Sequence, residues 1–265
     1  MATGQAIGVF DSGVGGLTVL KEIARHLPHE DLIYLGDTAR VPYGTKSPET
    51  VRRYALEAAD FLVERGVKML VVACNTASAV ALDALKAKYD LPVIGVIEPG
   101  AGRAAALTRS GKVGVIGTEG TIKSEAYPRA IRAIDPALDV VSVACPLFVP
   151  LAEEGWAEHD IARLAAVEYL GPIAREIDTL VLGCTHYPLL KTILHAVLGD
   201  GVELVDSAEE TAHTVVAQLG TARVDRLRQR TISFYVTDVP TRFERVGSAF
   251  LGNHLGAVTQ VSLAD

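Results

Sequence analysis

Two short stretches of this chain share one pattern, and they constrain its fold more than any other feature. Residues 69–78 (MLVVACNTAS) and 179–188 (TLVLGCTHYP) are each an apolar run that ends in a cysteine, followed by small polar residues. The runs are too short for helices and are typical of strands buried on both faces of a parallel sheet. The polar residues after them favour a helix start. We therefore expect Cys74 and Cys184 each to lie where a strand passes into a helix N-terminus.

That position has chemical consequences for a thiol. Open α/β sheets bind ligands at the edge where the strands end, and the backbone N–H groups and dipole of a helix N-terminus lower a thiol's pKa. A single cysteine after a strand is usually a small buried hydrophobe, but two cysteines in matched contexts indicate a two-base active site. Cys145 begins a Cys-Pro pair after another predicted strand and lacks this context. We interpret it as structural.

Strands and helices alternate along the chain, and the alternation repeats. The predicted strands are residues 6–11, 32–36, 69–73, 92–97, 112–117, 140–144, 179–183, 202–205 and 231–237. The predicted helices are residues 17–26, 48–65 after a Ser47 cap, 75–89, 121–134, 160–176, a helix from about 189, one capped by Ser207 that ends near 219, and 240–251. The first four strands match the next four at a nearly constant offset, and the third strand of each set carries the cysteine.

An internal repeat on this scale predicts the architecture. We expect an α/β protein of two similar parallel-sheet lobes, related by a pseudo-twofold axis, with the active site in the cleft between them. Residues 1–97 with about 207–265 would form the first lobe, which holds Cys74. Residues from about 98 to 206 would form the second, which holds Cys184, and the chain would cross between lobes at Glu98-Pro99-Gly100. One cysteine would then face each side of a bound molecule.

Composition and the absence of other motifs narrow the function classes. The glycine-rich turn at residues 12–16 follows the first strand but lacks both G-x-G-x-x-G and the Lys-Ser/Thr of a phosphate loop, so it favours close approach to a small ligand over nucleotide binding. The formal charge of −7 and scattered basic residues make nucleic acid an unlikely partner. No apolar run has the length of a membrane span, and the N-terminus resembles no signal peptide. Three cysteines, an odd number, argue against a disulfide framework and fit a reducing compartment. We therefore expect a cytoplasmic protein.

Five motifs in order resemble the glutamate racemase family of the aspartate/glutamate racemase superfamily. They are FDSGVGGLT at 10–18, GDTARVPYGTKS at 36–47, ACNTAS at 73–78, CPLFVPLAE at 145–153 and LGCTHYPLL at 182–190. The resemblance extends from about residue 6 to about 220. It is weaker beyond that point, although residues 231–238 still look like the closing strand of the family.

The resemblance implies a cofactor-independent enzyme that interconverts L- and D-glutamate for bacterial cell-wall (peptidoglycan) synthesis. Members are generally homodimers, and the two catalytic cysteines of the family fall on Cys74 and Cys184. Glu153 matches an acidic residue that supports the second cysteine and its histidine. The residues that match the substrate-binding positions are Asp11, Ser12, Pro42, Tyr43, Gly44, Asn75, Thr76, Thr121, Thr185 and His186. Neither a metal nor a cofactor is implied.

Racemisation gives each of these groups a chemical role. It removes the α-proton from one face of the substrate and delivers a proton to the other, which a thiolate and a thiol on opposite faces can do. A free thiol is mostly protonated at neutral pH, so the acting base needs help. We expect Asp11 to relay a proton for Cys74, and His186 with Glu153 to do so for Cys184. Hydroxyl and backbone N–H groups would donate hydrogen bonds to the carboxylates of the substrate. These donors belong to Ser12, Asn75, Thr76 and Thr185.

Other interpretations remain open at this stage. One alternative is a racemase of the same fold that acts on aspartate or another amino acid, and another is a binding protein whose lobes close on an amino acid without catalysis. His186 beside Cys184 also suits a Cys-His hydrolase or a metal pair, although no third ligand lies at metal-site spacing. Asp37 either lines the site or only caps the turn after the second strand. A secondary role, such as binding a DNA enzyme, is not decided by the sequence.

Overall fold

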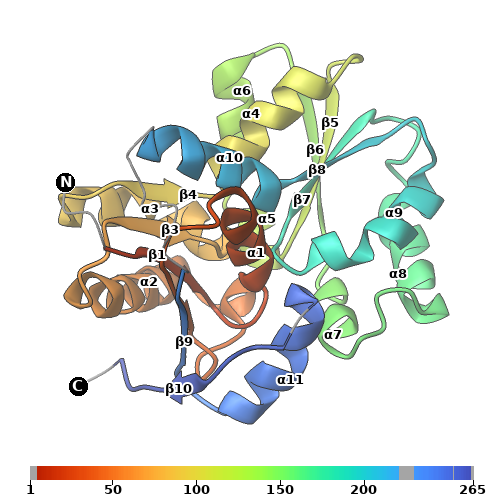
Figure 1. Cartoon of the computed structure of the whole chain (residues 1–265). Helices are drawn as coiled ribbons and strands as arrows, with labels where there is room; N and C mark the ends of the chain where they lie inside the picture. Colours follow the sequence, from red (N-terminus) through yellow and green to blue (C-terminus); the bar gives the residue numbers. More distant parts are fainter. Residues whose placement is uncertain (1–4, 221–229, 253, 264–265) are drawn as a thin grey trace.

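The computed structural model describes residues 5–220, 230–252 and 254–263, and its strands form two parallel β-sheets (Figure 1). The first sheet has the order β10-β9-β2-β1-β3-β4 and the second the order β6-β5-β7-β8. The strands of the first are β1 (Ile7–Asp11), β2 (Leu32–Gly36), β3 (Met69–Val72), β4 (Val93–Gly95), β9 (Ile232–Val236) and β10 (Val258–Gln260). Those of the second are β5 (Lys112–Gly117), β6 (Asp139–Ala144), β7 (Thr179–Gly183) and β8 (Glu203–Asp206).

The strand order confirms the repeat that the sequence predicts. Within the first sheet β2-β1-β3-β4 has the same order as β6-β5-β7-β8 in the second, so β3 corresponds to β7. All residues of β3 and β7 are buried, as expected of strands covered on both faces. Cys74 and Cys184 each lie just beyond the end of these matched strands. We propose that the lobes divide near residues 98 and 207, since strands β5 to β8 lie between these positions.

Helices cover both faces of the sheets. Those that pack on the first sheet are α1 (Leu17–His26), α2 (Pro48–Glu64), α3 (Asn75–Lys88) and α11 (Pro240–Leu251). Those that follow in the second half are α4 (Ile97–Leu107), α5 (Glu119–Lys123), α6 (Ala126–Ile134), α7 (Phe148–Glu153), α8 (Asp160–Leu170) and α9 (Lys191–Leu198). Helix α10 (Ser207–Leu219) packs against both α1 and α4 and so joins the two sets. One hydrophobic cluster accordingly runs from α1 through α10 into the second sheet.

Proline explains two differences from the predicted helices. The helix expected at 121–134 is split into α5 and α6, with Glu125 at φ 54° between them. Pro128 lacks an N–H, and its ring would clash with the carbonyl of Ser124 in a continuous helix. The helix expected to reach residue 176 ends at Leu170, because Pro172 has no N–H to donate to the carbonyl four residues earlier.

Other boundaries differ in smaller ways. Glu98-Pro99-Gly100, expected as the crossing point, lies inside α4, whose first turn tolerates a proline. Helix α10 is capped by Asp206, which accepts from the backbone N of Ala208 at 2.9 Å, and not by Ser207. The sequence prediction also missed the whole of α4, and it missed the short elements α7 and β10. Among the described residues, no helix combines the length and apolar character needed to cross a membrane.

Candidate active site

The two cysteines begin different local structures, although their strands correspond. Cys74 is the N-cap of α3, and its carbonyl accepts from the backbone N of Ser78 at 2.8 Å. The equivalent donor for Cys184 would be residue 188, which is a proline and has no N–H. The chain therefore passes through a turn and the 3-10 helix η2 (Tyr187–Leu190) before α9 begins at Lys191. The predicted helix N-terminus is confirmed for Cys74 and wrong for Cys184.

The environment of Cys74 is buried and acidic. Its Sγ lies 3.8 Å from Ser12 Oγ. Burial raises the pKa of this thiol to about 12 and the nearby Asp11 adds to the effect, whereas the Ala77 N–H and Ser12 lower it. The expected lowering by the helix N-terminus is therefore outweighed by burial. A charge on Cys184 also raises the Cys74 pKa, as the smallest of these effects.

Asp11 lies beneath Cys74 with only one of its two carboxylate oxygens bonded. Its Oδ2 accepts from the backbone N of Gly13 at 2.9 Å, and its Oδ1 is buried with no partner among the described residues. Burial raises the pKa of this carboxyl, partly offset by the positive charge of His186 and by backbone N–H groups. The carboxyl is thus poised to take up a proton more readily than an exposed aspartate.

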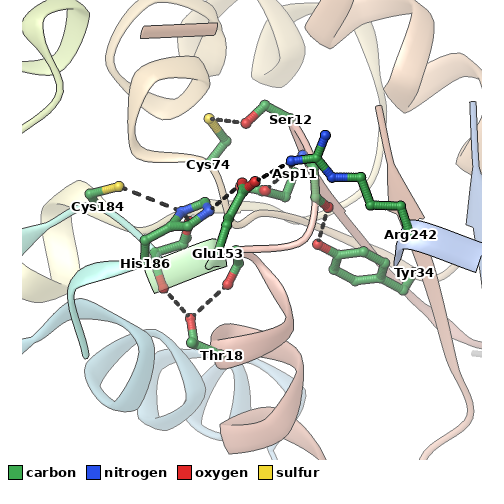
Figure 2. Close-up of polar contacts among 12 residues, drawn as sticks. Asp11, Ser12, Thr18, Tyr34, Cys74, Glu153, Cys184, His186 and Arg242 are labelled. Atoms are coloured by element: carbon green, nitrogen blue, oxygen red, sulfur yellow. Dashed lines mark hydrogen bonds and ion pairs between the residues drawn. The ribbon is translucent and has the colours of Figure 1, made fainter. Parts of the chain in front are cut away.

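A linear chain of polar groups supports Cys184. His186 Nδ1 lies 3.9 Å from Cys184 Sγ, and His186 Nε2 lies 3.0 Å from Glu153 Oε1 (Figure 2). Burial by itself lowers the His186 pKa, but the contacts with Cys184 and Glu153 outweigh it and raise this pKa to about 10. The same His186 contact lowers the pKa of Glu153. The predicted grouping of these three side chains is therefore present.

A cluster of hydroxyl groups joins the two lobes beside the cysteines. Thr76 Oγ1 lies 2.9 Å from Thr118 Oγ1 and 3.2 Å from Thr121 Oγ1, which are 3.1 Å from each other. Asn75 accepts from the Tyr127 hydroxyl at 2.7 Å, and its buried Nδ2 has no partner among the described residues. Sequence reasoning missed Thr118 and Tyr127. Thr118 had a signal, because it caps α5 directly after β5, at the same sheet edge.

The loop after β2 brings three predicted residues to the lobe boundary. Tyr43, the first residue of η1 (Tyr43–Thr45), is buried, and its hydroxyl donates a hydrogen bond to Asp37. Pro42, which precedes Tyr43, is exposed. A Cβ on Gly44 would lie 2.7 Å from Thr118 Cβ, so this loop touches the second lobe. Asp37 also accepts from Arg40 Nε at 2.7 Å. Of the two interpretations left open for Asp37, these contacts favour capping of the turn after β2 over lining the site.

The glycine-rich turn makes a second contact between the lobes. A Cβ on Gly15 would overlap Thr185 Oγ1 and lie 2.5 Å from His186 Nδ1. The Thr18 hydroxyl lies 3.0 Å from the Gly15 carbonyl and 3.1 Å from the Thr185 carbonyl. The close approach that the glycines permit is therefore to the second lobe.

The third cysteine lies apart from these contacts. Cys145 is fully buried, and its Sγ donates to the Val143 carbonyl at 3.7 Å, on its own strand. Burial first, and Cys184 second, raise its pKa. Among the described residues, no three His, Cys, Asp or Glu side chains are grouped so as to hold a metal ion.

Comparison with known proteins places the chain in a family. The Asp/Glu/Hydantoin racemase family model matches residues 7–215. The glutamate racemase of Geobacter metallireducens is 63% identical over 262 residues, which are 98% of this chain and 97% of that protein. The structure of a glutamate racemase isoform from Bacillus anthracis has a TM-score of 0.93 at 43% identity, with 99% of each chain covered. That of the Francisella tularensis glutamate racemase in complex with D-glutamate has a TM-score of 0.89 at 40% identity, with 98% of each chain covered.

The chain therefore belongs to the Asp/Glu/Hydantoin racemase family. Within that family, the relatives that match it from end to end are glutamate racemases.

Proposed function

We propose that this protein interconverts L-glutamate and D-glutamate, with Cys74 and Cys184 as the two bases. The observation that carries the proposal is the placement of two buried thiols at the ends of matched strands from different sheets. Each thiol has its own acidic support, Asp11 for Cys74 and the His186–Glu153 pair for Cys184. The full-length glutamate racemase relatives support the substrate.

The proton transfers balance without any other reactant. With L-glutamate, the Cys184 thiolate first takes the α-proton, and in a second step the Cys74 thiol gives its proton to the opposite face. The Cα–H bond on one side breaks as an S–H bond forms, and the reverse occurs on the other side. D-glutamate leaves with Cys184 protonated and Cys74 ionised, and His186 and Asp11 then help to restore the starting state. The assignment of each cysteine to one enantiomer follows the family resemblance.

The remaining side chains have positioning roles in this scheme. Burial keeps the Cys74 thiol protonated at rest, so it acts as an acid unless Asp11 accepts its proton. The unpartnered Asn75 Nδ2 supplies a donor for a carboxylate of the substrate. We assign the other carboxylate and ammonium contacts to Ser12, Pro42, Tyr43, Gly44, Thr76, Thr121, Thr185 and His186.

Two rival functions are less well supported. An aspartate racemase would need different contacts to the side-chain carboxylate, and the loop at Tyr43 and Gly44 matches the glutamate branch. A non-catalytic binding protein would not need an acid beside each of two buried thiols. We further propose that the enzyme uses no metal or pyridoxal phosphate, acts as a homodimer in the cytoplasm, and supplies D-glutamate for peptidoglycan.

A direct test is circular dichroism of L-glutamate incubated with the purified, chelator-dialysed protein and no added cofactor. The ellipticity should decay to zero as the racemic mixture forms. Replacing Cys74 or Cys184 by Ala should lower kcat by at least about 10²–10⁴-fold in both directions. The double variant should be little worse, since groups that act as a unit are not additive. Cys145→Ala is the control and should retain activity. A single-cysteine variant that keeps a substantial fraction of the parent rate would contradict the proposal.

A further inference from the structure

Helix α11 contacts the His186–Glu153 pair at two points, one on each residue. The Phe250 ring packs edge-on against the His186 ring, with centroids 5.3 Å apart at 85°. Arg242 Nη2 lies 3.1 Å from Glu153 Oε2, the oxygen that does not bond to His186 (Figure 2). Helix α11 lies beyond residue 215, where the family model's match ends. Helix α11 therefore contacts His186 and Glu153, the two side chains that support Cys184, from outside the matched residues.

The position of α11 does not depend on Arg242. Phe243, Val246 and Phe250 are buried in the hydrophobic core, and the Phe243 ring lies 5.8 Å from the Tyr34 ring. The Arg242 side chain, by contrast, is 61% exposed, whereas Glu153 is only 18% exposed. Exposed ion pairs contribute little to folding stability. A contact that is unimportant for stability, yet fixes one oxygen of a mostly buried catalytic carboxylate, points to a role in catalysis.

We propose that Arg242 is a positioning residue for racemisation, which fixes the Glu153 carboxylate so that Glu153 holds His186 toward Cys184. This inference rests on the proposed function, because it assigns a support to one of the two proposed bases. The two oxygens of the Glu153 carboxylate have different partners, His186 for Oε1 and Arg242 for Oε2. With Arg242 on Oε2, only Oε1 is directed at His186 Nε2. The His186 ring is then held with Nδ1 facing the Cys184 sulfur.

The role predicts an asymmetry between the enantiomers. The Arg242 side chain contacts Glu153, which lies on the Cys184 side of the site, so its loss acts first on proton transfer at Cys184. In Arg242→Gln, proton transfer at Cys184 slows and becomes more rate-limiting. The isotope effect of α-deuterated L-glutamate should therefore rise, because Cys184 removes that deuteron. The isotope effect of α-deuterated D-glutamate should fall, because its removal by Cys74 is no longer the slow step.

The experiment compares four full-length proteins: the parent, Arg242→Gln, Arg242→Lys and Arg245→Gln. Arg245 is exposed on the same helix and is the matched control for loss of charge. We expect Arg242→Gln to lower kcat roughly 10-fold with KM nearly unchanged, as for a misplaced catalytic group. Lys keeps the charge but not the planar guanidinium, so Arg242→Lys should be intermediate. The unfolding temperatures should agree within about 3 °C, and Arg245→Gln should match the parent.

The outcomes separate the inference from the function on which it rests. An inactive parent would refute glutamate racemisation itself. An active parent with Arg242→Gln unchanged in kcat and in both isotope effects would overturn the positioning role. Isotope effects that move in the same direction for both enantiomers would indicate a general structural defect and overturn it too. A rise in KM alone would show that Arg242 binds substrate instead.

Discussion

At the scale of single residues, the site buries ionisable groups that would be more stable in water. Asp11 is 1% exposed with an unpartnered oxygen, and Cys74 is 6% exposed with its pKa raised to about 12 by burial. Burying such groups costs free energy unless every lone pair is satisfied. If Asp11 relays a proton for Cys74 as we propose, its buried carboxylate lowers the free energy of unfolding in return for activity. A substitution at Asp11 separates the effect on activity from the effect on stability.

Asp11→Asn should make the protein more stable and less active. Burial raises the folded-state pKa of Asp11 above 3.8. The unfolded chain therefore loses this proton first, and Asp11 lowers the free energy of unfolding as pH rises above that value. Asn avoids the buried charge and can still accept from Gly13. We expect about 1 kcal/mol more stability at pH 8 and a kcat lower by about 10²-fold. Thermal unfolding and circular dichroism assays measure both, and a variant as active as the parent would contradict the role of Asp11.

At the scale of secondary-structure elements, the sequence predicts what depends on local periodicity. The apolar runs located the strands β1 to β9, and the matched strand–cysteine units revealed the repeat. The prolines at 128, 172 and 188 also carried a local signal, which a stricter use of the missing N–H would have found. Because Pro188 has no N–H to donate to the Cys184 carbonyl, the sequence itself argues against a helix that begins at Cys184. The short α7 and β10 span fewer than two full periods, so their apolar residues formed no repeating pattern.

Contacts between elements were much less predictable. The positions of Cys74 and Cys184 follow from their strand ends, but the site residues Thr118, Tyr127 and Arg242 come from elements distant in sequence. Their pairing depends on how the two sheets and α11 pack together, which periodicity does not encode. The expected pKa of Cys74 failed for the same reason, because burial by neighbouring elements exceeds the local effect of the helix N-terminus.

The turn between β1 and α1 provides a test at this scale. Gly15→Ala would place a methyl group against Thr185 Oγ1 and His186, so the turn and the second lobe must separate. We expect kcat to fall by on the order of 10²-fold, as for a displacement of about 1 Å. Gly13→Ala is the matched control, because its Cβ would meet only Val41 at 3.5 Å, an ordinary contact. Equal activity of the two variants, measured by racemisation rate, would mean that this contact does not position the site.

At the scale of the whole molecule, the repeated strand order gives a physical reason for the two bases that we propose. Each sheet supplies one cysteine at the end of its corresponding strand, β3 or β7. The supports around the cysteines have diverged, with a carboxyl beside one and a His-Glu-Arg chain beside the other. Contacts at Gly15 and Gly44 hold the lobes together at the site. In the proposed mechanism, one thiol removes or delivers a proton on each face of the α-carbon.

The measurement that tests this claim most directly is racemisation of L-glutamate in deuterated water, with both enantiomers recovered early in the reaction and analysed by mass spectrometry. Two separate bases predict that nearly every D-glutamate molecule carries solvent deuterium at the α-carbon, because the new hydrogen comes from the second thiol. The recovered L-glutamate should contain little deuterium. D-glutamate that retains the original α-proton, or L-glutamate labelled as fast as the product, would contradict the two-base account.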